Sequence, residues 1–568
     1  MLLSGRMRRL LLAALAAALL APAGARAADP IMPLRDVAAG MRCTGLTVIH
    51  GTAITSFDVE VLDVIDRDHL ENARILIRVS GPAVDATGVG PGFSGSPIYC
   101  PDAAGVARNI GAVSNSLGAY GGTVALATPI EAILAEPVQP PSSARRSRSA
   151  VVGSRELAVP LTLSGVRPSV AEMFQRAARR AGRTLLTSVA GSRAVGFPPQ
   201  PLVPGAAVSV ALTSGGIGLG AIGTVAYADG GAVWLFGHPL DAAGRRSLFL
   251  EDAYIATVVN NPLGAPDLST YKLGTPGNDV GTITNDAANA VVGRLGALPP
   301  NYPVRVFARD LDTGRTLGVT ALVADEGDVG GPTGPSILGI AGSAAVADVA
   351  AGVLGGAPAR QSGEVCATFT LRERRRPLRM CQHYAVDGGG PNALSGAAAM
   401  DFAKAASIID GYQFGLLHPT SVEVGLRLRR GLRQAYILDA SGPRHARRGR
   451  KVKLVLRLRR AGTGVRSTKT IELRIPADVK PGSHTIKLVG TDADAGSSPD
   501  ESDLTFVFDA GPSTQKQPQS VADVAREVTA LERYDGVTAT IGSSDIEAYR
   551  DPNLRISGEA RVALTVRR

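Results

Sequence analysis

Aromatic side chains are scarce in this sequence: Phe, Trp and Tyr together make up 4% of the 568 residues. Proteins that bind bases by stacking need aromatic side chains interleaved along their strands, and the strands predicted in the C-terminal half lack them. A nucleic-acid partner is therefore not expected. Glycine (67) and proline (37) are instead plentiful, a composition typical of globular domains built from short strands and turns.

Cysteine is also rare, with four residues, and no CxxC spacing indicates a zinc site. We expect neither a metal nor another cofactor. Four cysteines allow three pairings. We expect Cys43 to bond Cys100, because both flank the same N-terminal half-domain, and Cys366 to bond Cys381, because their flanking segments predict a hairpin.

Long hydrophobic runs are absent beyond the N-terminus. The first residues, MLLSGRMRRLLLAALAAALLAPAGARA, combine arginines, a Leu/Ala stretch and a small-residue site ending at Ala27. This pattern predicts a signal peptide cleaved after Ala27, since the apolar run from Leu10 to Ala21 is short for a bilayer. We therefore expect a secreted or cell-envelope-associated protein with no integral membrane segment after cleavage.

The charge is mildly basic. The formal net charge of +10 falls to +6 once the signal peptide, with four arginines and no acid, is removed. Such a charge favours weak contact with acidic cell-envelope polymers. The run from Arg444 to Lys451 is interpreted as a solvated face.

The chain divides by composition into alternating strand-rich and linker segments. Helices are expected near VAEMFQRAARRAG, GAAAMDFAKAASIIDGY and SVADVAREVTALERY, and in TPIEAILAE with Thr128 as N-cap. The predicted units are a signal peptide (1–27), a first β-rich half (28–137), a Pro/Ser/Arg linker (138–155), a second β-rich half (156–345), a mixed region with the Cys366–Cys381 hairpin (346–420), a β-sandwich-like domain (421–510) and a tail (511–568).

The hexapeptide Gly92-Phe93-Ser94-Gly95-Ser96-Pro97 is the most informative motif. A serine in a tight glycine-flanked turn can present its hydroxyl, while the N–H groups of Gly92 and Ser94 form an oxyanion hole. A Cβ at either glycine would crowd a substrate chain. By analogy with the GDSGGP turn of chymotrypsin-like peptidases, the predicted nucleophile is Ser94 and not Ser96.

The surroundings of this motif resemble the SpoIVB peptidase family. The resemblance runs from Asp29 to Glu131, through DPIMPLRDVAAGMRCTGLTVIHGT and RILIRVSGPAVDATGVGPGFSGSPIY, and continues from about 205 to 308 in GAIGTVAYADGGAVWLFGHPLDAAG, YKLGTPGNDVGTITND and GRLGALPPNYPVRV. It covers roughly the first 60% of the chain. It implies a mainly β, chymotrypsin-like double β-barrel, followed here by the β-sandwich-like domain. The serine precedes the histidine, an order that permutation of the two halves would explain.

The general base implied by the resemblance is His238, in the turn Phe236-Gly237-His238-Pro239. A histidine at the end of an apolar strand is held on one side and exposed on the other, as proton transfer requires. The chymotrypsin order of His, Asp and Ser would instead select His50 with Asp58 or Asp63. Triads are defined by geometry and not by chain order, so the Ser-before-His order is acceptable, and His50 is interpreted as a loop histidine.

The orienting acid is assigned to Asp286, which lies 48 residues after His238 in GTITNDAANAVVG. Asp85 is nearer the position that the sporulation enzyme uses, but the matching stretch here, Val79-Ser80-Gly81, has no carboxylate. Asp241 and Asp252 remain alternatives. An aspartate in a glycine-rich turn often caps that turn instead.

Two functions follow. The first is a secreted serine endopeptidase of SpoIVB type that hydrolyses a protein or peptide substrate by Ser/His nucleophilic catalysis. The second is a catalytically inactive exported scaffold that binds cell wall or protein through a peptidase-like core. Because a fold does not guarantee a function, the site itself has to discriminate between them.

Overall fold

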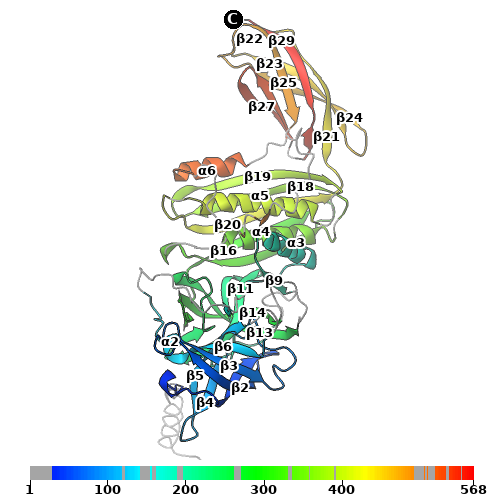
Figure 1. Ribbon diagram of the computed structural model, residues 1–568. Helices are drawn as coiled ribbons and strands as arrows, with labels where there is room; N and C mark the ends of the chain where they lie inside the picture. The colour runs from blue at the N-terminus through cyan, green and yellow to red at the C-terminus, as the bar shows by residue number, and fades with distance from the viewer. Residues whose placement is uncertain are drawn as a thin grey trace, which may run out of the picture.

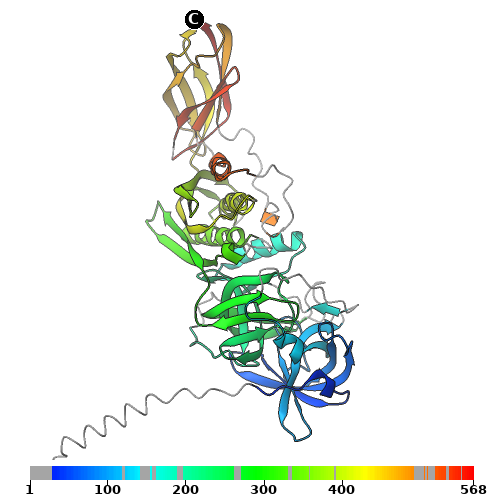
Figure 2. The same ribbon diagram turned by 90° about the vertical axis from the view of Figure 1, so that its left-hand side faces the viewer.

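The computed structural model describes residues 29–117, 122–140, 154–156, 161–188, 196–260, 270–329, 336–356, 358–388, 392–412, 414–490, 504–505, 508, 518–531, 536–551 and 553–567. Figure 1 shows an elongated molecule, with strands at both ends and most helices in the middle; Figure 2 shows it from the side. The mainly β class predicted from the sequence is confirmed. The expected signal peptide (1–27) and most of the expected linker (138–155) lie outside the described residues.

The N-terminal half forms a closed six-stranded barrel. Its strands follow the order β4-β1-β2-β3-β6-β5, and β4 pairs back with β5. Alternate residues of each strand point inward, and these β-branched and aromatic side chains fill a core of their own. Its strands are β1 (Arg42–Val48), β2 (Ile54–Ile65), β3 (Arg74–Ser80), β4 (Pro97–Pro101), β5 (Ala107–Leu117) and β6 (Val124–Pro129), with β7 (Ser154–Glu156) beside β5 and the short helix η1 (Leu34–Asp36) before β1.

The helix expected in TPIEAILAE is present but starts later than predicted. Thr128 is not its N-cap: it lies in β6, and helix α2 (Ile130–Leu134) begins after Pro129 with no side-chain cap. The hydroxyl of Thr128 instead donates to the carbonyl of Gly237, at 2.6 Å. A sequence pattern cannot show this long-range partner, which ties the barrel to the Phe236–Pro239 turn.

The second β-rich half belongs to a larger, curled sheet. Six of its strands pair in the order β10-β13-β14-β15-β12-β11, and β11 also pairs with β10. These strands are β10 (Ala207–Gly215), β11 (Gly218–Asp229), β12 (Ala232–Leu235), β13 (Gly244–Asn260), β14 (Thr270–Asp286) and β15 (Val291–Leu295). Beyond them, β8 (Leu161–Ser164) pairs with β11, and β9 (Leu185–Ser188) pairs with β8. These strand pairings do not by themselves establish a double barrel, which stays a prediction.

The same sheet continues into a helix-covered layer. Helices α4 and α5 pack on each other and on these strands, and the expected helices α3, α5 and α6 are present (Figure 1). The strands are β17 (Thr316–Ala324), β16 (Asn301–Asp310), β20 (Pro419–Arg430), β18 (Arg360–Leu371) and β19 (Arg374–Asp387); the helices are α3 (Pro168–Arg180), η2 (Gly327–Val329), α4 (Ile337–Val353), α5 (Ala393–Asp410) and α6 (Val521–Ala530).

Helix α4 was not expected from the sequence. Its residues are almost all apolar and almost all buried, so it has no polar face and none of the amphipathic period by which a surface helix is predicted. No helix within the described ranges is both long enough and apolar enough to cross a membrane.

The C-terminal unit consists of two sheets around one core (Figure 1). Its extent differs from the expected 421–510 domain at both ends. Strand β20 pairs with β16 and β18 of the large sheet, while the tail beyond 511 supplies strands to both C-terminal sheets. One sheet contains β24 (Arg466–Arg474), β23 (Lys451–Arg460), β21 (Gln434–Ser441) and β28 (Arg555–Ser557); the other contains β22 (His445–Arg447), β29 (Glu559–Arg567), β25 (Gly482–Gly490), β26 (Gly536–Ile541) and β27 (Ser544–Arg550).

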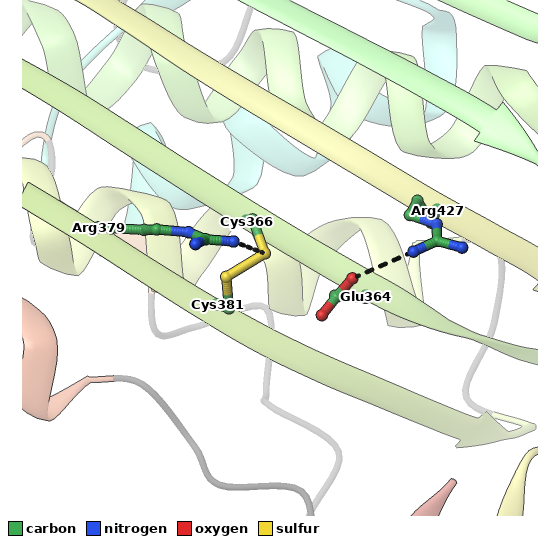
Figure 3. Close-up of a disulfide and its surroundings, with 5 residues drawn as sticks. All are labelled: Glu364, Cys366, Arg379, Cys381 and Arg427. Atoms are coloured by element: carbon green, nitrogen blue, oxygen red, sulfur yellow. Dashed lines mark hydrogen bonds and ion pairs between the residues drawn. A yellow bond between two sulfur atoms is a disulfide. The ribbon is translucent and has the colours of Figure 1, made fainter. Parts of the chain in front are cut away.

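Both expected disulfides are present. Cys43 of β1 bonds Cys100 of β4 inside the barrel core, and Cys366 bonds Cys381. The second pair lies directly opposite across the β18–β19 hairpin. Figure 3 shows the Cys366–Cys381 bond and, farther along the sheet, the ion pair between Glu364 and Arg427. The guanidinium of Arg379 lies 3.8 Å from the Cys366 sulfur.

Removal of the barrel disulfide is expected to destabilise the protein more than removal of the hairpin disulfide. The first joins residues 57 apart and the second residues 15 apart. The entropy lost on closing these loops in the unfolded chain corresponds to about 4 and about 3 kcal/mol. In guanidinium unfolding, we expect the Cys43→Ala/Cys100→Ala double variant to lose more free energy of unfolding than the Cys366→Ala/Cys381→Ala double variant. The reverse order would contradict loop length as the main cause.

Candidate active site

Ser94 lies in a tight turn between β3 and β4, as its glycine-rich sequence predicted. Gly92 (φ +94°) and Gly95 (φ +88°) both adopt the left-handed region that favours glycine. The N–H of Phe93 donates to Gly90 at 3.0 Å, and that of Ser96 donates to Phe93 at 2.9 Å. The N–H of Gly95 donates to Val113 of β5 at 2.8 Å, which anchors the turn to the barrel.

Two backbone amides of this turn have no acceptor among the residues that the structure describes. They are the N–H groups of Gly92 and Ser94, for which no hydrogen bond to a described residue is found. Buried backbone N–H groups are almost always paired, so unpaired amides beside a serine hydroxyl are the feature expected of an oxyanion hole. They are the two amides that the sequence analysis selected.

His238 lies in a strained turn after β12. Phe236 and Gly237 both have φ of +69°, and for a bulky residue such as Phe236 this conformation costs energy. The Phe236 ring is fully buried, and it packs so closely on Gly223 that a Cβ there would lie 2.3 Å from a ring carbon. The turn is thus held by packing of Phe236 and by the Thr128–Gly237 hydrogen bond.

The imidazole of His238 has a defined orientation. Its Nδ1 lies 2.7 Å from the carbonyl oxygen of Pro239. A carbonyl can only accept, so Nδ1 carries the proton and Nε2 carries the lone pair of the neutral ring. The Pro239 carbonyl thereby selects the tautomer that a general base requires.

Strand β11 brings the serine and histidine turns together. The N–H of Thr224 donates to the carbonyl of Ser94 at 2.9 Å, and the N–H of Phe236 donates to the carbonyl of Thr224 at 3.3 Å. A Cβ on Gly95 would lie 2.6 Å from the Phe236 nitrogen. The two turns are therefore in backbone contact although they are more than 140 residues apart in the sequence.

Both key side chains are buried. Ser94 is 0% exposed and His238 is 1% exposed. Within the described part of the chain, the Ser94 hydroxyl has no hydrogen-bond partner. The serine–histidine hydrogen bond is therefore not formed here, and a substrate would need both an opened path and a small movement of the turns.

Asp286 binds the turn that follows His238. Its carboxylate accepts the backbone N–H groups of Leu240, Asp241 and Ala243, at 2.7, 2.8 and 3.2 Å. Burial raises the pKa of Asp286, while Arg246, 3.9 Å away, and these N–H groups oppose the rise. The acid expected to orient the imidazole thus caps this turn, and the group at hydrogen-bond distance from Nδ1 is the Pro239 carbonyl.

The alternative candidates lie in other settings. His50 is exposed, and its ring nitrogen Nδ1 lies 2.9 Å from the Ala256 carbonyl oxygen. Asp85 is also exposed and accepts the Gly81 N–H. Asp58 and Asp63 are exposed on β2. Asp241 is exposed beside Arg246, whereas Asp252 is buried and accepts the N–H groups of Gln200 and Asn278.

Lys272 of β14 was missed by the sequence analysis. Its side chain passes beneath Gly92, where a Cβ would lie 2.8 Å from the lysine Cβ, and its Nζ lies 2.6 Å from Thr47 Oγ1. Burial lowers the pKa of Lys272 to about 7. The alternating pattern of β14 could have revealed it, because Lys272 occupies an inward position between Thr270 and Gly274.

Comparison of the chain with models of protein families, with curated proteins and with solved structures gives no match. The resemblance to SpoIVB peptidases accordingly remains a prediction from the motifs. No group of His, Cys, Asp and Glu side chains in the described ranges has an arrangement that could hold a metal ion.

Proposed function

We propose that this protein is an exported serine endopeptidase of SpoIVB type, in which Ser94 attacks the scissile carbonyl of a protein or peptide. The observation that carries the proposal is the turn itself: a serine between two left-handed glycines, beside two amides without an acceptor among the described residues, in backbone contact with a histidine turn. This combination supplies a nucleophile, an oxyanion site and a base within one contact region.

The pairing of the second β-rich half supports a chymotrypsin-like double barrel for the catalytic core. The ring from β10 through β13, β14, β15, β12 and β11 back to β10 joins six strands, as in the N-terminal barrel. Ser94 comes from the first ring and His238 from the second. Catalytic groups from two barrels lie where the barrels contact each other. Here the hydrogen bond from the Thr224 N–H to the Ser94 carbonyl is such a contact between the two rings.

In the proposed mechanism, His238 Nε2 accepts the Ser94 proton as the hydroxyl oxygen attacks the carbonyl carbon. The N–H groups of Gly92 and Ser94 donate to the developing oxyanion. The imidazolium then gives its proton to the leaving amine, and water repeats the sequence on the acyl-enzyme. The Pro239 carbonyl holds Nδ1–H throughout, and Asp286 fixes the turn from which that carbonyl projects.

Burial of the site favours a second candidate function, the inactive exported scaffold. Ser94 is fully buried, and its hydroxyl has no partner within the described residues. A core retained only as a scaffold would tolerate both features. The disulfides fit an extracytoplasmic location for either function.

Labelling with a fluorophosphonate probe separates the two functions. We expect wild type to be labelled and Ser94→Ala to lose labelling at least about 10³-fold, because an activated serine is the nucleophile in this chemistry. Ser164→Ala is the matched control: it removes a buried hydroxyl from β8, outside both turns, and should label like wild type. Equal labelling of Ser94→Ala and wild type, or none of wild type, would reject the peptidase.

A further inference from the structure

A basic groove lies on the C-terminal unit, at the opposite end of the molecule from the N-terminal barrel (Figure 1). It has a volume of about 820 Å³ and runs between β22, the turn that follows it, the start of β23 and the end of β29. None of the described residues that line it has a carboxylate or a Phe, Tyr or Trp ring. The lysines and arginines that line it are Arg447, Arg450, Lys451, Lys453 and Arg567.

Strand pairing brings these positive charges together. β22 and β29 run parallel, and Arg447 lies opposite Arg567 in their register. The N–H of Arg450 donates to the carbonyl of Arg447 at 3.2 Å, which fixes the turn before β23. On β23, Lys451 and Lys453 are both exposed and the residue between them is buried, so both lysines project from the same face of the sheet. The fold thus gathers charges from three strands and a turn around one groove.

Few of these charges are neutralised within the protein. Lys451 pairs with Glu472 of β24 at 3.0 Å. The other four cations form no ion pair with a described carboxylate: Arg447, Arg450, Lys453 and Arg567. One reason is local, because no Asp or Glu occurs between Asp439 and Glu472. Like charges directly opposite on paired strands are destabilising, so the Arg447–Arg567 pair favours a bound anion.

The chemistry of the lining suits phosphate groups that repeat along a chain. The planar guanidinium of an arginine can donate two parallel hydrogen bonds to one phosphate, and a lysine adds a compact point charge. Three arginines and two lysines line the groove, so it can hold more than one phosphate at a time. All five side chains are exposed, and a chain can therefore lie along the groove.

Two other polyanions fit this groove less well. Single-stranded nucleic acids are held by stacking of their bases on aromatic rings, and the described lining residues include no Phe, Tyr or Trp. An acidic peptide gains affinity by adding a strand to an open sheet edge. The edge strand here, β22, has only three residues, so it offers few backbone groups for such pairing.

We propose that this groove binds an anionic cell-envelope polymer of phosphodiester-linked units that carry no bases. The run from Arg444 to Lys451 is solvated, as the sequence predicted, but the fold gathers part of it into a binding site. The proposal does not depend on the peptidase. An active enzyme and an inactive scaffold would both be held at an anionic surface through the C-terminal unit, with the N-terminal barrel at the other end of the molecule (Figure 1).

An abasic oligonucleotide, which is a phosphodiester chain without bases, serves as the probe for the full-length protein. By fluorescence anisotropy we expect saturable binding, with an affinity within about 2-fold of that of a base-bearing strand of the same length. A poly-aspartate peptide of equal charge should bind at least about 10-fold more weakly. The slope of log affinity against log salt should become shallower by about 0.7 in Arg447→Gln and in Lys453→Gln, since each loses one phosphate contact.

Arg305→Gln is the matched control. It removes the same charge from an exposed arginine of β16 in the large sheet and should keep the wild-type salt slope. Equal changes in Arg305→Gln and the groove variants would show that net charge attracts the polymer, and would overturn the proposal. Tighter binding of the base-bearing strand would indicate a nucleic-acid site instead, and tighter binding of poly-aspartate an acidic protein partner. Absence of binding to the abasic strand would also reject the proposal.

Discussion

Gly95→Ala is expected to destabilise the barrel core by at least about 3 kcal/mol. A Cβ at this position would lie 1.9 Å from the Thr224 carbonyl oxygen and 2.6 Å from the Phe236 nitrogen. Both are backbone atoms of paired strands or turns, so neither can rotate away. The added methyl forces the serine turn off β11, at a cost above that of ordinary overpacking.

Gly105→Ala is the matched control for this prediction. Gly105 also has a left-handed backbone (φ +77°), but a Cβ there would meet nothing within 4 Å. It should therefore show only the conformational cost of a non-glycine residue, about 1 kcal/mol. Denaturant unfolding of both variants measures the difference. Equal losses would mean that the serine turn does not contact β11 as closely as described.

Raising the pH from 7 to 9 is expected to stabilise the protein through Lys272. Its pKa is about 7 when folded, against an ordinary value of 10.5. Between these values the unfolded chain binds more protons than the folded one, so the free energy of unfolding rises with pH. The cost of the buried charge is complete below pH 7 and disappears above 10.5. From pH 7 to 9 the Lys272 contribution should improve by about 2 kcal/mol.

Lys272→Met isolates this contribution, because every other titrating group is common to both proteins. The difference between the unfolding free energies of wild type and variant should therefore shift by about 2 kcal/mol in favour of wild type from pH 7 to 9. Thr213→Val, which removes a buried hydroxyl that donates to the Ile217 carbonyl, should show no such shift. A constant difference across this range would show that Lys272 titrates normally.

Several features follow from local sequence. The glycine-flanked Ser94 turn, the hairpin closed by Cys366 and Cys381, and the amphipathic helix α3 each depend on residues close together in the chain. Glycine is needed where φ is positive, and apolar spacing selects strand or helix. For these reasons the mainly β class, the Cys366–Cys381 pair and the serine turn could be predicted.

Other features depend on which distant segments pair. The tail beyond 511 contributes strands to both C-terminal sheets, and α4 has no polar face by which to recognise it. Asp286 caps the turn after His238 with three backbone amides. Such features depend on which distant segments pack together and in which register the strands pair, and composition does not encode this directly.

The sequence by itself determined the serine turn and placed a histidine in a second turn far along the chain. Only the tertiary structure decided that β11 joins these two turns, that the Pro239 carbonyl holds the imidazole, and that Lys272 lies under the serine turn. The physical reason is that local backbone preferences fix a turn from its own residues. The environment of a buried amine or imidazole is set by strands that meet only on folding.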